Sequence, residues 1–302
     1  MEFIMDSLEV LQQINILSSS ILSNFNSITL KDYIERYYIP FQKNGKKEVN
    51  YRHILGQLNI IAGYEFTDKA INTITENDII NFFNLLKKDR NIKQATINRY
   101  RSLLNHIFNL AMKDKIVNYN PVKYTKRYKE KSRERALNSE EIQALLKACK
   151  SSRNEELYYI VLTALYTGMR YSNIVNMKKS NIKNNVYQLD GCETKSGKSQ
   201  FIYLHNDLLN ELNKYIQTSN RDNIFITKRV KRSFKTACNK AGIENFRFHD
   251  LRRTFATTLL YNNVNIVTIS NMLGHSSIMM TERYLANDSK KELDAINKLC
   301  FI

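Results

Sequence analysis

Apolar residues recur at intervals of three and four along most of this chain, and the pattern stops in one basic stretch. Such intervals are typical of helices that bury one face. The stretch is residues 121–137, where VKYTKRYKEKSRERA holds seven basic residues, two acidic ones and almost nothing apolar. A chain of 302 residues with 43% hydrophobic content has room for two cores. The sequence therefore predicts an extension at 1–27, a helical domain at 28–120, a basic linker at 121–137 and a second domain at 138–302.

Four helical segments are expected in the first domain. They are LKDYIERYYIPFQ after Thr29, residues 51–61, a segment that begins at Thr75, and ATINRYRSLLNHIFNLAMK. Thr75 is followed three residues later by Asp78, which is a signature of a helix N-terminus. No hairpin signal interrupts these segments, which favours a small helical bundle. The extension also has helical spacing, and its role is left open: Leu8, Leu11, Ile14 and Leu17.

The second domain combines helical segments with one β signal. Ser139 is expected to cap a helix, and the apolar repeat of residues 157–169 stops near Gly168. Residues 227–241 are expected to form a basic helix whose charged side fits DNA or solvent equally well. Residues 185–204 alternate imperfectly, with Ser196 and Gly197 supplying a turn between two strands. We therefore expect a mainly α fold with a small antiparallel β-sheet in the second domain.

The net charge of +17 lies mostly in the second half of the chain. Residues 1–118 hold 15 basic and 12 acidic residues, whereas the remainder holds 31 and 17. A polyanion should therefore lie mainly against the second half, although ribosomal and membrane-peripheral proteins are equally basic. Five side chains in the fourth helix and the linker are candidate DNA contacts, with a solvated polar face as the alternative: Asn98, Arg99, Arg101, Lys126 and Arg127.

Cysteine usage and missing motifs exclude several other classes. The four cysteines show no CxxC spacing, so we expect reduced thiols in a cytoplasmic protein and no metal site: Cys149, Cys192, Cys238 and Cys300. The sequence has no GxxxxGK[ST] loop for ATP and no carboxylate cluster for Mg²⁺, so no cofactor is expected. Acidic residues interrupt the N-terminal apolar stretch, and no apolar run reaches membrane-spanning length. These features argue against secretion and against a membrane protein.

Residues 248–285 hold the densest group of chemically capable side chains. As a helix, HDLRRTFATTLL places His249 and Arg252 on one side, offered to a ligand, and its apolar residues on another. A helix over 266–273 should end at Gly274, which leaves His275 on the turn.

Ser276 can cap a further helix that carries Tyr284 back toward the other groups. Guanidinium groups bind phosphate oxygens, imidazoles move protons, and a neighbouring tyrosine is a plausible nucleophile. The combination points to chemistry on a phosphodiester.

Three other residues are ambiguous when each is considered alone. Arg170 follows a predicted helix end, where an arginine usually caps carbonyls or faces water. Lys195 stands at the predicted hairpin turn, and lysines are common on exposed turns. Tyr261 lies at the far end of its helix without a neighbouring histidine, and we interpret it as structural.

Together these fragments resemble the tyrosine recombinase, or phage integrase, family. The match rests on TGMR ending at Arg170, TKSGK with Lys195, HDLR with His249 and Arg252, LGH with His275, and Tyr284 nine residues later. Each motif is weak, but five in this order are specific, and they cover the second domain. The first domain, with NPV at residues 120–122, is similar to the family's core-binding (SAM-like) domain. The resemblance implies a two-domain C-clamp on DNA.

The resemblance also implies a role for each matched residue. Tyr284 would attack the scissile phosphate and form a 3′-phosphotyrosyl link, while Arg170 and Arg252 would hold the non-bridging oxygens. Lys195 would protonate the leaving 5′-oxygen, His249 would assist proton transfer at the tyrosine, and His275 would hydrogen-bond the phosphate. One position departs from the pattern, because family members commonly carry Glu or Asp three residues after the first arginine and this chain has Asn173.

The implied function is site-specific DNA recombination, meaning integration, excision or resolution, at inverted half-sites. A homotetramer on two DNA duplexes would carry it out, with accessory proteins as further partners. The tail has helical spacing at Leu293, Ile296 and Leu299, which suits packing on a neighbouring subunit or on its own domain. A type IB topoisomerase and a non-catalytic DNA-binding protein on the same fold are the alternatives. The target sequence and the direction of the reaction are left open, as is the choice between chromosome-dimer resolution and mobile-element integration.

Overall fold

The structure is a computed structural model that divides the chain into two compact units between Lys131 and Ser132, inside the predicted linker. Each unit has a hydrophobic core of its own. The structure describes residues 28–45, 48–130, 134–194, 197, 199–217, 221–275 and 277–282. The predictions for the extension, Lys195, Ser196, Ser276, Tyr284 and the C-terminal tail lie outside the described residues.

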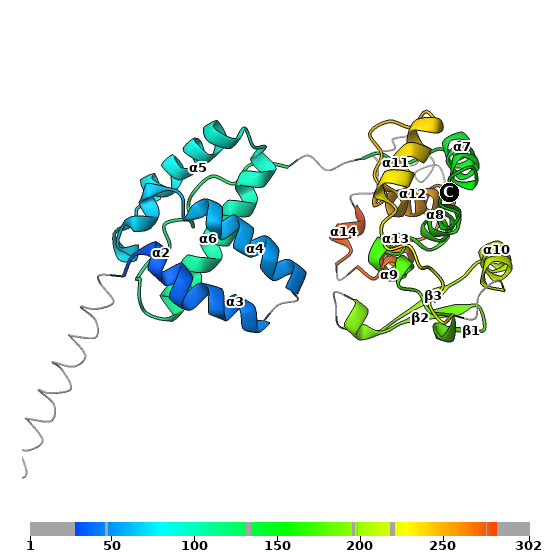
Figure 1. Cartoon of the computed structure of the whole chain (residues 1–302), viewed down its shortest axis with the longest axis horizontal. Helices are drawn as coiled ribbons and strands as arrows, with labels where there is room; N and C mark the ends of the chain where they lie inside the picture. The colour runs from blue at the N-terminus through cyan, green and yellow to red at the C-terminus, as the bar shows by residue number, and fades with distance from the viewer. Residues whose placement is uncertain are drawn as a thin grey trace, which may run out of the picture. The chain divides into compact units, whose positions relative to one another are not determined.

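The first unit is helical in its described part (Figure 1). Its elements are α2 (Leu30–Tyr33), a π-helical turn (Ile34–Tyr38), α3 (Ile39–Gly45), α4 (Glu48–Ile61), two 3-10 turns (Glu65–Asp68 and Ile71–Thr73), α5 (Glu76–Arg90) and α6 (Gln94–Lys113). The predicted start of α5 is confirmed, because the hydroxyl of Thr75 accepts from the amide of Asp78 while the Asp78 carboxylate accepts from the amide of Thr75.

The first predicted helix contains a π-helical turn just before Pro40. Proline has no backbone N–H and disturbs the regular ladder of a helix interior. The amide of Ile39 donates to the carbonyl of Ile34, five residues back, so the ladder widens immediately before the proline. The chain thus runs from α2 into α3 without a break.

Helix α6 organises the core of the first unit. The residues predicted to be buried along it are buried: Ile97, Leu104, Ile107 and Phe108. The start of the predicted linker also packs here, because Val122 is fully buried in the same core and Thr125 is 4% exposed. The expectation that residues 121–137 bury almost nothing is therefore wrong at both ends of the segment, because Leu137 is also buried, in the core of the second unit.

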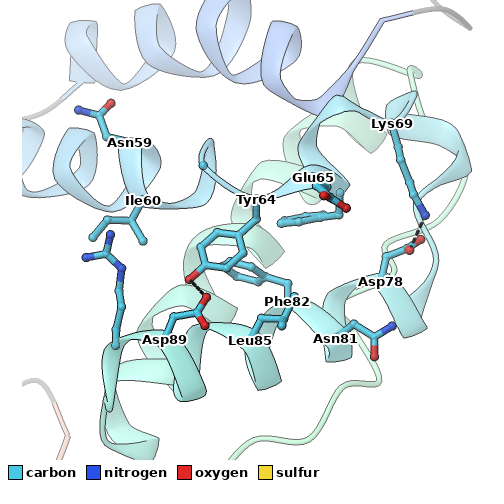
Figure 2. Close-up of a pocket in the computed structure, with 13 residues that line it drawn as sticks. Asn59, Ile60, Tyr64, Glu65, Lys69, Asp78, Asn81, Phe82, Leu85 and Asp89 are labelled. Carbon is cyan, nitrogen blue, oxygen red and sulfur yellow. Dashed lines mark hydrogen bonds and ion pairs between the residues drawn. The ribbon is translucent and has the colours of Figure 1, made fainter.

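A surface hollow of about 860 Å³ lies beside α4 and α5 in the first unit (Figure 2). Its floor includes the rings of Tyr64 and Phe82. At its edge the Nζ of Lys69 lies 2.7 Å from a carboxylate oxygen of Asp78. None of the candidate site residues lines this hollow, so it adds nothing to the predicted chemistry.

The second unit combines helices with a β-sheet in its described part (Figure 1). Its helices are α7 (Ser139–Lys150), α8 (Glu156–Thr167), α9 (Tyr171–Val175), α10 (Asn206–Ile216), α11 (Lys231–Lys240), α12 (Asp250–Tyr261), α13 (Ile266–Leu273) and α14 (Met279–Glu282), with 3-10 turns at Lys179–Asn181 and Gly191–Glu193. Helix α8 is almost entirely buried and packs against α7, α10 and α12. Within the described ranges, no helix combines the length and apolar character needed to cross a membrane.

The sheet has three strands rather than the two predicted. Strands β1 (Ile182–Lys183), β2 (Val186–Leu189) and β3 (Gln200–Tyr203) pair antiparallel in the order β1-β2-β3. Asn184 and Asn185 join β1 to β2 with φ values of 48° and 63°. Two consecutive positive φ angles are typical of a tight hairpin turn, and asparagine tolerates them. The prediction began at this turn and therefore missed β1.

Two helix starts differ from the predictions by a few residues. Asn138, rather than Ser139, caps α7, because the Asn138 side chain accepts from the amide of Glu141. Helix α11 begins at Lys231 instead of residue 227. Its predicted apolar side is buried: Val230, Phe234 and Cys238.

A buried carboxylate anchors the first turn of α8. Glu156 is 7% exposed and accepts from the hydroxyl of Tyr215 at 2.6 Å and from the amides of Ile226 and Thr227 at 2.9 and 2.7 Å. Burial by itself raises the pKa of Glu156, but the hydrogen bonds from these groups outweigh it and hold the pKa below its usual range. This contact ties the loop before α11 to α8.

Candidate active site

The N-terminal end of α12 carries two of the predicted site residues. His249 is the residue before the helix and is exposed, whereas Arg252, in the first turn, is only 4% exposed. The apolar side of the helix is buried as expected, with Leu251 at 0% and Phe255 at 6%. The two residues that helical spacing places on one side thus differ in burial, because the guanidinium of Arg252 reaches into the domain. The expectation that this side is offered to a ligand stays a prediction.

Arg252 joins two turns that lie far apart in the sequence. Its Nη1 donates to the carbonyl oxygen of Gly168 at 2.9 Å, and its Nη2 donates to the carbonyl oxygen of Leu273 at 2.6 Å. Gly168 precedes Arg170 by two residues, and Leu273 precedes His275 by two. One side chain therefore brings the TGMR and LGH motifs to the start of the HDLR helix.

Gly168 allows this close packing. It ends α8 with φ 62°, a conformation that favours glycine. A Cβ atom placed on it would lie 2.5 Å from the ring of Phe255 and 2.8 Å from the side chain of Leu273. A side chain at this position would collide with Phe255 of α12 and Leu273 of α13. The close packing of α8 against these two helices therefore depends on glycine.

Arg170 lies at the start of α9 and is half-buried. The ring of the next residue, Tyr171, packs edge-on against Phe248 with 4.8 Å between centroids. Phe248 in turn precedes His249. This aromatic contact therefore brings the chain segment of Arg170 to the segment of His249, beside the α12 N-terminus.

His275 follows the C-terminal end of α13 and is half-buried. Gly274 ends the helix with φ 62°, as predicted. The Nδ1 of His275 lies 2.7 Å from the hydroxyl oxygen of Thr281, which is fully buried in α14. Sequence reasoning missed Thr281, because a lone threonine carries no signal until the turn places it against the imidazole.

The departure at Asn173 leaves a buried amide next to the site. Asn173 is 7% exposed, and its side-chain oxygen accepts from the hydroxyl of Ser172 at 3.3 Å. Its backbone amide donates to the carbonyl of Arg170. The amide thus retains the acceptor function that a carboxylate would have, without the charge.

Hydrogen bonds and a ring contact bring together the chain segments that carry Arg170, His249, Arg252 and His275, at the N-terminal end of the twelve-residue helix α12. Backbone N–H groups and cations at such a terminus bind anions, and imidazoles can donate hydrogen bonds or transfer protons. In the part of the chain that the structure describes, no three His, Cys, Asp or Glu side chains are grouped to hold a metal. The arrangement suits a phosphate diester.

The DNA-binding candidates of the first unit differ in their surroundings. Asn98 is 5% exposed and donates to the Tyr128 carbonyl and the Glu130 carboxylate, both at 2.8 Å. Arg101 donates to the carbonyls of residues 122, 123 and 125 and to the Thr125 hydroxyl. Both side chains therefore hold the start of the basic segment on α6, which periodicity could not show.

The remaining three candidates are exposed. Arg99 donates to the carbonyl of Ala95 in its own helix, and the Nζ of Lys126 lies 5.8 Å from the ring centroid of Tyr128. Arg127 directly follows Lys126, in the segment that Asn98 and Arg101 hold on α6, and it is also exposed. In the second unit, α11 presents a basic side to solvent: Lys231, Arg232, Lys235 and Lys240.

Family models match both units. Residues 135–291 match the phage integrase family, and residues 29–136 match the phage integrase SAM-like domain. Among curated relatives, the integrase of Haemophilus phage HP1 (strain HP1c1) is 33% identical over 204 residues, which cover 66% of this chain and 58% of the relative. The chain thus spans less than two thirds of that relative's length.

A second relative and a solved structure extend the match. Tyrosine recombinase XerC of Caldanaerobacter subterraneus subsp. tengcongensis is 28% identical over 247 residues, covering 76% of this chain and 69% of the relative. A crystal structure of a lambda integrase tetramer bound to a Holliday junction has a TM-score of 0.73 and 24% identity, and covers 90% of this chain and 81% of that one. This structural likeness supports the fold, and the two family models together cover most of the chain.

Proposed function

Because this chain belongs to the phage integrase family, we propose that it is a tyrosine-type site-specific recombinase that cuts and rejoins DNA through a 3′-phosphotyrosyl intermediate. The observation that carries the proposal is the pair of hydrogen bonds from Arg252 to Gly168 and Leu273. These bonds gather three of the motifs that sequence reasoning could only list separately. The relatives named integrase and tyrosine recombinase support the same conclusion.

In the proposed site, Arg170 and Arg252 bind the two non-bridging oxygens of the scissile phosphate. Negative charge grows on these oxygens as the phosphorus becomes five-coordinate, and two cations placed beforehand stabilise it. His275 donates a hydrogen bond to the same phosphate, with its ring oriented by Thr281. The N-terminus of α12 adds its partial positive charge.

The proposed cleavage step exchanges one phosphate ester for another. The Tyr284 oxygen forms a bond to phosphorus, and the bond to the 5′-oxygen of the next nucleotide breaks. His249 assists removal of the phenol proton, and Lys195 supplies a proton to the departing 5′-oxygen. The energy of the ester is retained in the phosphotyrosine, so a second strand's 5′-hydroxyl can reverse the step without ATP.

We further propose that both units contact the duplex, as a C-clamp. The exposed side chains of Arg99, Lys126 and Arg127 would bind phosphates on behalf of the first unit. Asn98 and Arg101 would contribute mainly by holding that surface in place.

The proposed assembly is a homotetramer on two duplexes with inverted half-sites. Accessory proteins would join it where the reaction needs direction. Lambda integrase, which has a similar fold, forms a tetramer on a Holliday junction. We also propose that the reaction takes place in the cytoplasm, because a reducing compartment suits a chain whose described cysteines are thiols.

The decisive test is covalent capture of DNA on Tyr284. Wild-type protein and Tyr284→Phe are incubated with host genomic DNA, and the attached fragments are sequenced. We expect wild type to yield adducts at one short site with inverted half-sites, bearing a free 5′-hydroxyl, and the variant to yield none. No adduct from either protein would favour a DNA-binding protein, and nicking and religation without exchange between two duplexes would favour a topoisomerase.

The captured site then allows a test of Lys195. A synthetic substrate with a 5′-bridging sulfur has a leaving group that needs no proton. Lys195→Ala should therefore cleave ordinary DNA slowly and the sulfur substrate at close to the wild-type rate. Equal loss on both substrates would exclude the acid role.

A further inference from the structure

The C-terminal end of α13 is held by two side chains from other elements. The last carbonyls of a helix have no partner within it. Here the Nε2 of Gln200 donates to the carbonyl oxygen of Met272 at 2.6 Å, and Arg252 donates to that of the following residue, Leu273. The same Nε2 lies 3.5 Å from the carbonyl oxygen of Asn271.

Gln200 also packs directly against the turn that leads to His275. A Cβ atom placed on Gly274 would lie 2.5 Å from the Oε1 of Gln200 and 2.9 Å from its Cδ. The backbone amide of His275 donates to the carbonyl of Ser270. The amide of Gln200 therefore fills the space beside Gly274, and the next residue carries the imidazole.

Gln200 reaches this turn from the sheet. It begins β3 and is paired with Leu189 of β2. It lies more than seventy residues before Met272 in the chain, so its contact is a tertiary one. Through it the first residue of β3 and the end of α13 are fixed to each other.

We propose that Gln200 is a positioning residue for strand cleavage: it holds the turn at Gly274 against β3 and thereby fixes the imidazole of His275 beside the scissile phosphate. The inference rests on the proposed function only for the role of His275. The hydrogen bond to Met272 and the packing on Gly274 are independent of it. Thr281 contacts the imidazole itself, so loss of Gln200 releases the turn before His275 while the contact between the ring and Thr281 remains.

The first test replaces the Gln200 amide with groups of similar length. Gln200→Met keeps the length but removes the donor, and Gln200→Glu places a carboxylate against two carbonyl oxygens. We expect the single-turnover cleavage rate of the Met variant to fall about tenfold, because small displacements of a catalytic group have large kinetic effects. The Glu variant should be slower still, and DNA affinity should stay within about twofold in both.

The matched control is Gln188→Met. Gln188 is an exposed glutamine on β2, in the same sheet, and it is paired with Phe201, the residue after Gln200. Its variant should cleave at the wild-type rate. An equal loss in the Gln188 and Gln200 variants would show a general effect of the sheet and would overturn the proposal.

A double-mutant cycle tests whether the effect passes through His275. If it does, Gln200→Met combined with His275→Ala should cleave no more slowly than His275→Ala alone. Multiplied rate losses in the double variant would overturn the proposal. So would a His275→Ala variant with the wild-type rate.

A measurement without DNA separates this inference from the proposed function. The chain has five histidines, so His275 can be assigned in a carbon–proton NMR spectrum by comparison with His275→Ala. In Gln200→Met we expect its signal to move while the other four histidine signals keep their positions and report an intact fold. An unmoved His275 signal would overturn the inference, whereas failure of wild type to form an adduct would remove only the proposed function.

Discussion

Arg101 in the first unit and Arg252 in the second make the same kind of contact with different consequences. Each guanidinium donates to backbone carbonyls outside its own helix. The acceptors of Arg101 all lie within residues 122–125, so it fixes one loop to one helix. The acceptors of Arg252 lie in two separate turns, so it fixes those turns relative to each other.

The difference shows that the role of such an arginine depends on which residues follow its carbonyl acceptors in the chain. The loop held by Arg101 leads to exposed basic residues, and its loss should weaken binding to a polyanion. The turns held by Arg252 lead to Arg170 and His275, and its loss should lower the rate of a reaction. Variants of the two residues can therefore separate affinity from catalysis.

The largest effect is expected for Arg252→Ala. It removes a cation from the proposed phosphate site and leaves two carbonyls of buried turns without their donor. We expect the single-turnover cleavage rate to fall by about 10³ or more, and the free energy of unfolding of the second unit to fall by about 3 kcal/mol. Arg153→Ala, at an exposed position of the same unit, is the control. Cleavage within tenfold of wild type would contradict the proposed role.

A smaller and different effect is expected for Arg101→Ala. We expect the free energy of unfolding of the first unit to fall by about 2 kcal/mol and the dissociation constant for DNA to rise about tenfold, because the loop that carries Lys126 and Arg127 loses its attachment. The cleavage rate at saturating DNA should not change. Arg99→Ala, on the same helix but exposed, should alter the unfolding free energy by less than about 0.5 kcal/mol.

Thiol labelling assigns these effects to one unit. All four cysteines lie in the second unit. Burial, with a contribution from Cys238, raises the pKa of Cys149 to about 12, so this thiol should react with iodoacetamide only when the second unit opens. Arg252→Ala should accelerate its labelling, and Arg101→Ala should leave it unchanged. Faster labelling in Arg101→Ala would mean that the two units do not unfold separately.

The smallest effect concerns Glu156, which is at the other end of α8 from Gly168. Its folded-state pKa is depressed below the ordinary value of 4.5, so its contribution to stability is present above that value and is lost as the pH falls through the folded-state pKa. We expect Glu156→Gln to lower the unfolding free energy by about 1 to 2 kcal/mol at pH 7, with the difference from wild type shrinking as the pH falls below the ordinary value of 4.5 and through the folded-state pKa. Urea unfolding of both proteins at several pH values measures this. Cleavage at pH 7 should stay within about twofold of wild type, and a larger loss would place Glu156 among the groups that control the reaction.

Local signals predicted one helix of the second unit from its start to its end. The helix over residues 266–273 and its stop at Gly274 agree with the structure, because apolar spacing and a left-handed glycine are both encoded within a few neighbouring residues. The start of α5 in the first unit was predictable for the same reason, because its capping residues Thr75 and Asp78 are only three positions apart. The hairpin at Asn184 and Asn185 was missed because asparagine adopts positive φ less often than glycine and gives a weaker signal.

Contacts between distant segments could not be predicted in this way. The sequence indicated that Asn98 and Arg101 belong to a polar side of a helix, but the loop that covers that side follows more than twenty residues later. The motifs predicted which residues of the second unit are chemically capable. They did not predict that Arg252 is buried, or that Gln200 and Thr281 hold the His275 turn. Such support depends on tertiary packing and leaves no fixed spacing in the chain.

The absence of a side chain at Gly168 determines how closely α8, α12 and α13 pack. A methyl group there would have to displace the ring of Phe255 or the side chain of Leu273, and either movement would carry Arg252 or the segment of His275 with it. The spacing of the three converging helices at this point is therefore set by a hydrogen atom, the smallest substituent that a Cα can carry.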